Sequence, residues 1–249
     1  MKRERIDKLL VERGLAPSRA RAQAFVMAGL VLVDEQRVEK SSETFAPEAS
    51  IRVRGSDDPA ARYVGRGGLK LEAALRAFAV DVRDSVCLDI GASTGGFTDC
   101  LLQRGAKKVY AIDVGHGQLA WKIRIDPRVI AREHLNARHL SREDIPEPVD
   151  ICVIDVSFIS LTLILLNAFE LITPNGVILA LIKPQFELQP EEIGRGGIVA
   201  DPALHAKAKR KIEDFVTAQG HLSAGITPSP ITGMDGNQEF FVCARKASA

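Results

Sequence analysis

Cysteine is scarce in this chain of 249 residues, and its four copies form no motif. Cys87, Cys100, Cys152 and Cys243 lie far apart, each in an apolar stretch and none in a CxxC pair. Disulfide frameworks and zinc sites need paired or regularly spaced ligands, so neither is expected. The five histidines also lack regular ligand spacing, and no metal is predicted. We expect the cysteines to be small core residues in a reducing compartment.

Long apolar runs and a hydrophobic leader are missing as well. The longest apolar stretch, near residues 159–169, is far shorter than the ~20 residues that a membrane-spanning helix requires. The N-terminal residues are charged and lack the apolar region of a signal peptide. These absences predict a cytoplasmic protein and disfavour a pore-forming one.

Aromatic residues are few, and the net charge is close to zero. Phe, Trp and Tyr make up 5% of the chain, which disfavours extensive base stacking as the main contact with nucleic acid. The formal net charge of +1 predicts no nucleic-acid partner by itself. Residues 1–55, however, hold 11 Lys and Arg against 8 Asp and Glu, whereas the remainder holds 22 against 24. A basic front segment favours an RNA-contacting module, although a solvated helical surface explains the charge equally well.

The pattern of the front segment indicates a small α+β unit. Apolar residues at helical spacing predict a helix over residues 5–13, which Gly14 ends. Ser18 is a good N-cap for a second helix, which Gly29 ends. Strands are predicted over 31–33, 37–38 and 51–54. We therefore expect a domain over residues 1–55, a linker over 56–64, and a second domain over 65–249.

The second domain alternates strands with helices, a pattern typical of an α/β fold with a parallel-rich sheet covered on both faces. The predicted strands span residues 86–90, 109–114, 151–156, 177–182, 222–226 and 240–244. The predicted helical regions span residues 69–79, 95–104, 118–125, 161–172 and 201–219.

A glycine-rich loop follows the first of these strands, in the run Cys87-Leu-Asp-Ile-Gly-Ala-Ser-Thr-Gly-Gly-Phe97. It lacks the GxGxxG spacing of a dinucleotide site, because Ser93 stands at the second glycine position, and it is no phosphate loop. Glycines at the carboxyl end of a parallel strand let a ligand lie against the backbone. The acidic Asp89 suits a ligand with a cationic, methionine-like group, and Asp113 ends the next strand, where a carboxylate can accept both ribose hydroxyls.

These features resemble the S-adenosylmethionine site of class I methyltransferases, and a structural glycine turn is the simpler alternative. Asn136 and Arg138 lie where an adenine-side contact is expected, and a solvated turn explains them equally well. The cofactor contacts predicted in this way are Asp89, Gly91, Ala92, Ser93, Gly95, Gly96, Phe97, Asp113, Asn136 and Asp155.

Four charged residues stand beside apolar strands or just beyond the linker. Asp155 and Lys183 each follow an apolar strand, Glu239 precedes one, and Lys70 follows Gly65-Arg-Gly-Gly-Leu. A charge beside a buried strand is costly unless it is paired, so strand-end salt bridges would explain each residue taken singly. Together the four indicate a catalytic site.

The order Lys70, Asp155, Lys183, Glu239 resembles the tetrad of ribose 2′-O-methyltransferases related to the FtsJ heat-shock enzyme. Longer phrases resemble the TlyA, or haemolysin A, family across essentially the whole chain: Ser-Arg-Ala-Arg-Ala near residue 18, Gly-Arg-Gly-Gly-Leu-Lys near 65, and Ile-Asp-Val-Ser-Phe-Ile-Ser near 154. The front unit resembles an S4 RNA-binding domain. It departs from that pattern at Asp34-Glu35, where an Asn-Gly turn is frequent.

The resemblance implies a Rossmann-like class I methyltransferase domain behind a small S4-like domain, with S-adenosylmethionine as cofactor and ribosomal RNA or ribosomal subunits as partner. The expected activity is methyl transfer to a ribose 2′-hydroxyl, with cytidine as the nucleoside. The RNA contacts expected from the front unit are Arg3, Arg5, Lys8, Arg19 and Arg21.

The chemistry requires a base to take the proton of the 2′-hydroxyl, and we assign that role to Lys183. A free lysine has a pKa of ~10.4, which burial and a neighbouring cation lower toward the useful range. Lys70 is expected to supply that cation, and Asp155 and Glu239 to orient the two ammonium groups.

Three other functions remain as alternatives. An RNA-binding ribosome-assembly factor with little or no catalytic activity would be expected to have a broken tetrad or a filled glycine loop. A small-molecule methyltransferase would not need the basic front unit. A membrane-active haemolysin would need an amphipathic or membrane-spanning element, and the sequence shows none.

Overall fold

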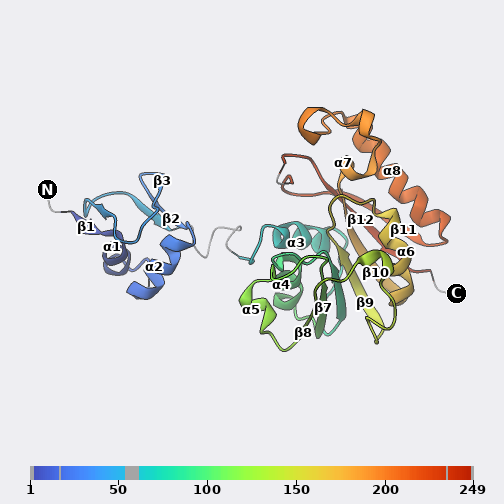
Figure 1. Ribbon diagram of the computed structural model, residues 1–249, viewed down its shortest axis with the longest axis horizontal. Helices are drawn as coiled ribbons and strands as arrows, with labels where there is room; N and C mark the ends of the chain where they lie inside the picture. Colours follow the sequence, from blue (N-terminus) through green and yellow to red (C-terminus); the bar gives the residue numbers. More distant parts are fainter. Residues whose placement is uncertain (1–2, 17, 54–61, 234, 248–249) are drawn as a thin grey trace. The chain divides into compact units, whose positions relative to one another are not determined.

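The chain forms two compact units, Met1–Arg62 and Tyr63–Ala249, in the computed structural model (Figure 1). The structure describes residues 3–16, 18–53, 62–233 and 235–247. Most of the expected linker, residues 56–64, lies outside the described residues.

The first unit packs two short helices against small antiparallel sheets. Its elements are β1 (Glu4–Arg5), α1 (Ile6–Glu12), α2 (Arg19–Met27), β2 (Val31–Val33), β3 (Gln36–Arg37), β4 (Thr44–Phe45) and β5 (Ile51–Val53). The sheets have the orders β3-β2-β5 and β1-β4. Apolar side chains one or two helical turns apart, including Ile6 and Leu10 on α1 and Ala22 and Val26 on α2, form the core against Val31 of β2. Burial of this shared apolar surface holds the helices on the sheet.

The turn between β2 and β3 forms although it lacks the usual Asn-Gly pair. Asp34 and Glu35 both adopt positive φ angles, 50° and 63°, as a two-residue hairpin turn requires. Leu32 then pairs with Arg37 across the hairpin. The negative charge of Glu35 is paired with Arg52 at 2.6 Å, so it is balanced within the unit.

The second unit is a seven-stranded sheet with helices on both faces. Its strands are β6 (Val86–Ile90), β7 (Lys108–Ile112), β8 (Val129–Arg132), β9 (Val149–Ile154), β10 (Ile172–Ile182), β11 (Leu222–Pro228) and β12 (Phe240–Arg245). They lie in the order β11-β12-β10-β9-β6-β7-β8. Strand β12 runs antiparallel to both of its neighbours, and the strands from β10 to β8 run parallel to one another. The expected parallel-rich, Rossmann-like α/β fold is confirmed.

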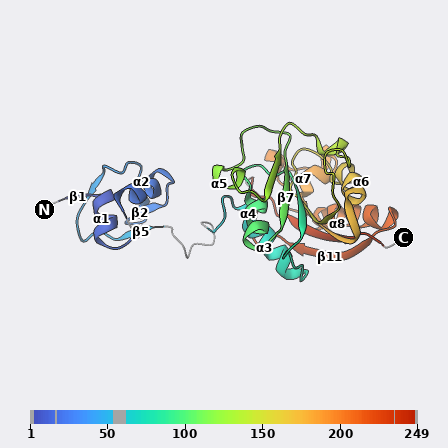
Figure 2. The ribbon, with the colours of Figure 1, turned by 90° about the horizontal axis from the view of Figure 1, so that it is seen from below.

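Two apolar layers sandwich this sheet. The helices are α3 (Gly67–Ala77), α4 (Gly96–Gln103), α5 (Trp121–Arg124), α6 (Thr162–Leu171), α7 (Pro184–Glu187) and α8 (Pro202–Ala218). Side chains of α3 and α4 share one buried cluster with one face of the sheet, and side chains of α6 and α8 share another with the opposite face. Figures 1 and 2 show these helix pairs on opposite sides of the strands. Strand β6 lies between β9 and β7 and is buried along its whole length.

The sequence did not predict strands β1, β4 and β8 or the short helix α7, and it predicted one helix that is too long. Strand β8 was not predicted, because its residues are half-exposed or exposed and show no strong apolar alternation. The helix expected over 118–125 is the single turn α5. The parallel register places Ile90 beside Ile154, so the loops after β6 and β9 leave the same edge of the sheet. The polar residues that follow these strands therefore meet.

Candidate active site

A cavity of about 510 Å³ opens at the carboxyl edge of the parallel strands. The glycine loop after β6, the start of α3, and the segments that follow β9 and β10 line it, as does the loop before β12. All four tetrad residues, Lys70, Asp155, Lys183 and Glu239, are part of its wall. The fold thus brings together residues that lie far apart in the sequence.

Lys70 and Glu239 form a buried ion pair. The Nζ atom of Lys70 donates to Oε2 of Glu239 at 2.5 Å, and the two side chains are only 10% and 3% exposed. Helix α3 presents the lysine, and the glutamate stands immediately before β12. Because both charges are removed from water, each depends on the other for compensation.

Lys183 forms the second ion pair of the cavity. It follows β10 and caps α7, and its Nζ atom lies 2.6 Å from Oδ1 of Asp155, which follows β9. The same ammonium donates to the hydroxyl of Ser157 at 2.9 Å. Asp155 is 22% exposed, so this pair has more access to solvent than the first.

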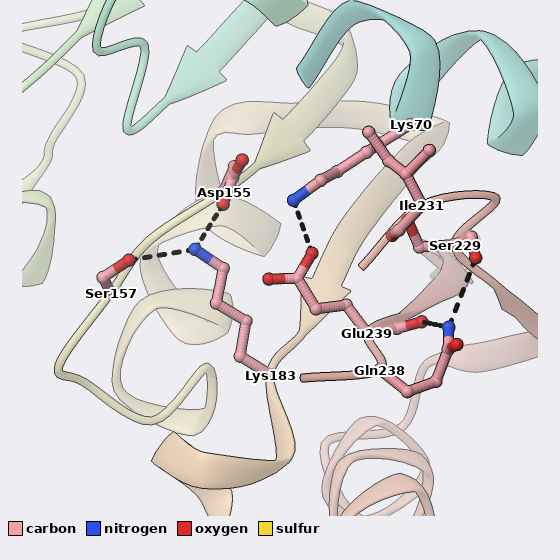
Figure 3. Close-up of polar contacts among 8 residues, drawn as sticks. All are labelled: Lys70, Asp155, Ser157, Lys183, Ser229, Ile231, Gln238 and Glu239. Carbon is pink, nitrogen blue, oxygen red and sulfur yellow. Dashed lines mark hydrogen bonds and ion pairs between the residues drawn. The ribbon is translucent and has the colours of Figure 1, made fainter. Parts of the chain in front are cut away.

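Figure 3 shows the two lysines reaching toward the same space from different elements. The sequence predicted Lys70 as a neighbouring cation for Lys183. In the structure each ammonium has a carboxylate partner of its own, so each positive charge is locally balanced. The two carboxylates lie within ion-pair distance of the ammonium groups, and their orienting role stays a prediction.

Contacts within the protein require glycine at two positions of the loop after β6. A Cβ atom at Gly91 would lie 2.2 Å from the carbonyl oxygen of Asp155, and Gly91 has a φ of +86°. A Cβ atom at Gly96 would lie 3.1 Å from the backbone nitrogen of Gly68. These glycines therefore let the β6 loop approach β9 and α3 closely, a reason that sequence reasoning did not give.

Asp113 organises the same loop. Its Oδ2 atom accepts a hydrogen bond from the backbone N–H of Ser93, and its Oδ1 atom accepts one from that of Gly115, both at 2.7 Å. It lines a smaller cavity together with Ala92 and Ser93, beside the main one. A carboxylate has further lone pairs, so ribose hydroxyls can still bind to it.

Asp89 lies fully buried beneath the glycine loop. Its Oδ2 atom accepts a hydrogen bond from the hydroxyl of Thr98 at 2.6 Å, and burial raises the pKa of Asp89 to about 7. Among the described residues no hydrogen-bond donor reaches its Oδ1 atom. A buried acceptor without a donor suits a ligand that carries a cation or an N–H group. Asp89 lines neither cavity at the glycine loop as the described residues define them, so its contact with the cofactor stays a prediction.

The remaining predicted cofactor contacts differ in their placement. The wall of the main cavity includes Gly91, Ala92, Ser93, Gly96 and Phe97. Gly95 begins α4 and faces the side chain of Leu119. Asn136 accepts a hydrogen bond from the backbone N–H of Arg138, and neither residue lines the two cavities at the glycine loop as the described residues define them.

Sequence reasoning missed two aromatic residues at the cavity mouth. Phe158 is 91% exposed and has a φ of +63°, which is unfavourable for a side chain of this size. Its ring lies 5.0 Å from that of Phe186. Both rings line the main cavity and a neighbouring one of about 460 Å³ that Arg138 also borders. An exposed aromatic residue in the left-handed region is a recognisable sign of a functional loop only once the backbone is known.

Glu187 is a further residue without a predicted role. It is buried, and it accepts hydrogen bonds from the backbone N–H of Leu161 at 2.7 Å and from the hydroxyl of Ser160 at 2.6 Å. Lys211 of α8 pairs with it at 2.9 Å. Glu187 therefore holds the far end of the loop that carries Asp155 and Phe158.

The basic residues of the first unit differ in how their charges are balanced. Arg3 donates to the carbonyl oxygen of Thr44, and Lys8 lies between Glu4 and Glu12 at 3.3 Å and 3.2 Å. The predicted contacts Arg5 and Arg19 are both partly exposed. The side chain of Arg21 lies outside the described residues.

Two protein families match this chain. The FtsJ-like methyltransferase family matches residues 63–246, and the S4 domain matches residues 4–51. The first match covers well over half of the chain, so this protein belongs to the FtsJ-like methyltransferase family and carries an S4 domain. S-adenosylmethionine is accordingly its methyl donor.

Individual relatives cover nearly the whole chain. The 16S/23S rRNA (cytidine-2′-O)-methyltransferase TlyA of Mycobacterium tuberculosis is 43% identical over 98% of this chain and 90% of that protein. Hemolysin A of Brachyspira hyodysenteriae is 40% identical over 95% of this chain and 97% of its own length. A solved structure of a candidate hemolysin from Streptococcus thermophilus has a TM-score of 0.76 at 43% identity, covering 100% of this chain and 90% of that one. No helix in the described ranges is long and apolar enough to span a bilayer.

Proposed function

We propose that this protein transfers a methyl group from S-adenosylmethionine to a ribose 2′-hydroxyl of ribosomal RNA, with cytidine as the target nucleoside. The observation that carries the proposal is that two lysine–carboxylate pairs line one cavity beside the glycine loop. The M. tuberculosis relative, 43% identical, bears the name of that activity, as does a Campylobacter jejuni relative at 35% identity over 72% of this chain. We further propose that residues 1–55 are the RNA-binding domain, residues 56–64 the linker, and residues 65–249 the catalytic domain.

In this proposal the sulfonium of the cofactor supplies an activated methyl group, and the protein supplies orientation and a proton acceptor. Lys183, in its unprotonated form, would accept the proton of the 2′-hydroxyl, and the bound cofactor would supply the methyl group to that oxygen and leave as a neutral thioether. Asp155 and Ser157 hold the Nζ atom of Lys183 at a fixed point. Lys70 and Glu239 hold the opposite side of the cavity, so that the reacting atoms are kept in line.

The aromatic pair at the cavity mouth fits an RNA substrate. Phe158 presents its ring to solvent beside the tetrad, where an unstacked base can pack against it. The S4 domain supports RNA binding, and ribosomal RNA or subunits are the partner that we propose. A ribosomal substrate would place the enzyme in the cytoplasm.

The test is methyl transfer from tritium-labelled S-adenosylmethionine to purified ribosomal subunits, followed by mapping of ribose methylation at single nucleotides. We expect label at a cytidine 2′-oxygen with wild-type protein and none with Lys183→Ala. A protein lacking residues 1–55 should keep its affinity for S-adenosylhomocysteine and lose most of its affinity for ribosomal RNA. Label on a base, or RNA binding without any transfer, would replace the proposal by a base methyltransferase or an assembly factor, respectively.

A further inference from the structure

A buried carboxylate lies among the basic residues of the first unit. Asp7, in the first turn of α1, is 0% exposed, although it is charged and near the surface. Charged side chains are rarely buried to this extent unless they are paired. The residues that pair with it are two of the arginines expected to contact RNA.

The contacts of Asp7 join both helices of the unit. Arg5 donates to it through two nitrogens, from Nε to Oδ1 at 3.1 Å and from Nη2 to Oδ2 at 2.9 Å. Arg19 of α2 donates from Nη2 to the same Oδ2 atom at 3.1 Å, and Gln23, one turn later, does so at 3.0 Å. The two guanidinium groups are therefore neighbours that contact a common oxygen atom.

The guanidinium groups remain available to a ligand. Their side chains are 45% and 59% exposed, and each guanidinium has five N–H donors, of which the carboxylate takes two from Arg5 and one from Arg19. Two positive charges against one buried negative charge leave an excess of +1 toward solvent. Lys8, in contrast, lies between two partly exposed glutamates.

We infer that Asp7 is a positioning residue for RNA binding, which holds Arg5 and Arg19 as a fixed pair that contacts one backbone phosphate group. The inference rests on the proposed function, because it takes RNA as the ligand of the S4 domain. Planar guanidinium groups bind phosphate oxygens through paired hydrogen bonds, and fixing them beforehand reduces the side-chain entropy lost on binding. An acidic residue thereby strengthens the binding of a polyanion.

The test relies on two effects of Asp7 that change RNA affinity in opposite directions. Its negative charge should weaken RNA binding, whereas its positioning of the arginines should strengthen it. Asp7→Asn removes one negative charge, which by itself should tighten RNA binding. Its amide offers one neutral acceptor oxygen in place of two charged ones, so at least one arginine bond is lost, the others lose their charge assistance, and the arginine pair is held less firmly. Glu12→Gln, the matched control, removes the same charge from an exposed position on α1. We expect Asp7→Asn to bind a fluorescein-labelled RNA stem-loop about tenfold more weakly, the loss of one charge-assisted hydrogen bond. Glu12→Gln should bind as well as wild type or better.

The full-length protein serves in every measurement, and a calorimetric melting profile that keeps the transition of the first unit shows whether Asp7→Asn is folded there. Arg19→Gln alone should lose affinity, and adding Asp7→Asn to it should cost far less than Asp7→Asn costs in wild type. Equal or tighter RNA binding by Asp7→Asn, or fully additive losses, would overturn the inference.

A second variant keeps the test decisive if Asp7→Asn does not fold. Arg19→Lys alters an exposed side chain and keeps its charge, but it removes the planar group. We expect weaker RNA binding than for Arg37→Lys, an exposed arginine that pairs with Glu39 outside the cluster. Equal affinities for these two variants would also refute the arginine pair. Wild-type RNA binding by both Arg5→Gln and Arg19→Gln would refute the arginine pair in the same way. If instead the protein that lacks residues 1–55 binds RNA like wild type, the proposed role of the S4 domain itself fails.

Discussion

The two lysines of the active site should respond differently to the same substitution. Lys70→Met removes the partner of Glu239, whose side chain is 3% exposed, and leaves an uncompensated buried charge. Removing one member of a buried pair costs about 3–5 kcal/mol. For a unit of this size each kcal/mol lowers the melting temperature by about 2–4 °C, so the shift should be roughly 6–20 °C.

Lys183→Met should have the reverse profile. Its partner Asp155 is 22% exposed and can be hydrated when the lysine is gone, so the loss of stability should be about 1–3 kcal/mol at most. The rate of methyl transfer should fall by about 10²–10⁴, as for the loss of a general base. Lys183→Arg should not restore it, because a guanidinium remains protonated at any working pH.

Calorimetric melting and single-turnover methyl transfer to ribosomal RNA, with the enzyme in excess, separate the two effects. The double variant Lys70→Met with Glu239→Leu is the control. It should recover most of the lost melting temperature, because no buried charge is left unpaired, without recovering activity. A Lys70→Met protein that melts like wild type would contradict the buried pair. A Lys183→Met protein with the wild-type rate would contradict the base.

Three further predictions concern the cofactor loop and the loop after β9. Asp113→Ala should weaken S-adenosylhomocysteine binding about 10- to 100-fold in calorimetry, since charge-assisted hydrogen bonds to ribose are lost, and unchanged affinity would refute the contact. Burial raises the pKa of Asp89 to about 7 from 3.8, so its contribution to stability is present below about pH 4 and is lost as the pH rises through 7. Relative to Asp89→Asn, the ligand-free wild type should lose up to about 4 kcal/mol across that window in urea unfolding, and parallel pH profiles would refute this. Glu187→Gln should loosen the loop that carries Phe158 and raise the KM for RNA several-fold without changing S-adenosylhomocysteine affinity, whereas weaker cofactor binding would point to a general loss of fold.

Much of the second unit was predictable because its central strands are short apolar runs separated by turn residues. Strands β6 and β9 are buried, and their apolar residues alone identify them as strands. Strand β8 lies at the edge of the sheet, is half-exposed and shows no alternation of apolar and polar residues. The hairpin turn of the first unit shows the opposite case. Asp34 and Glu35 both take left-handed angles, which aspartate tolerates and glutamate does not favour, and the pairing of β2 with β3 around them is compatible only with such a turn.

The four charged residues that line the cavity could be named from sequence, but which lysine pairs with which carboxylate could not. Lys70 and Glu239 are separated by 169 positions, and only the packing of α3 against the end of β12 makes them neighbours. The sequence placed Lys70 near Lys183 with the carboxylates to orient them, and the fold shows which carboxylate pairs with which lysine, Glu239 with Lys70 and Asp155 with Lys183. Residues that act through loop conformation, such as Phe158, carry no periodic signal at all.

Each unit contains a buried carboxylate that is paired with a basic side chain, Asp7 in the first unit and Glu239 in the second. In the second unit the Lys70–Glu239 pair is nearly inaccessible, while Lys183 and its partner keep some contact with solvent. A residue that must change protonation during a reaction needs a route for its proton, and a residue that only fixes geometry does not. The two lysine side chains are almost equally buried, at 10% and 12% exposed, so the difference lies in their partners. The 22% exposed Asp155 gives the Lys183 pair a route to solvent, which suits the proposed base, whereas the 3% exposed Glu239 gives none to Lys70.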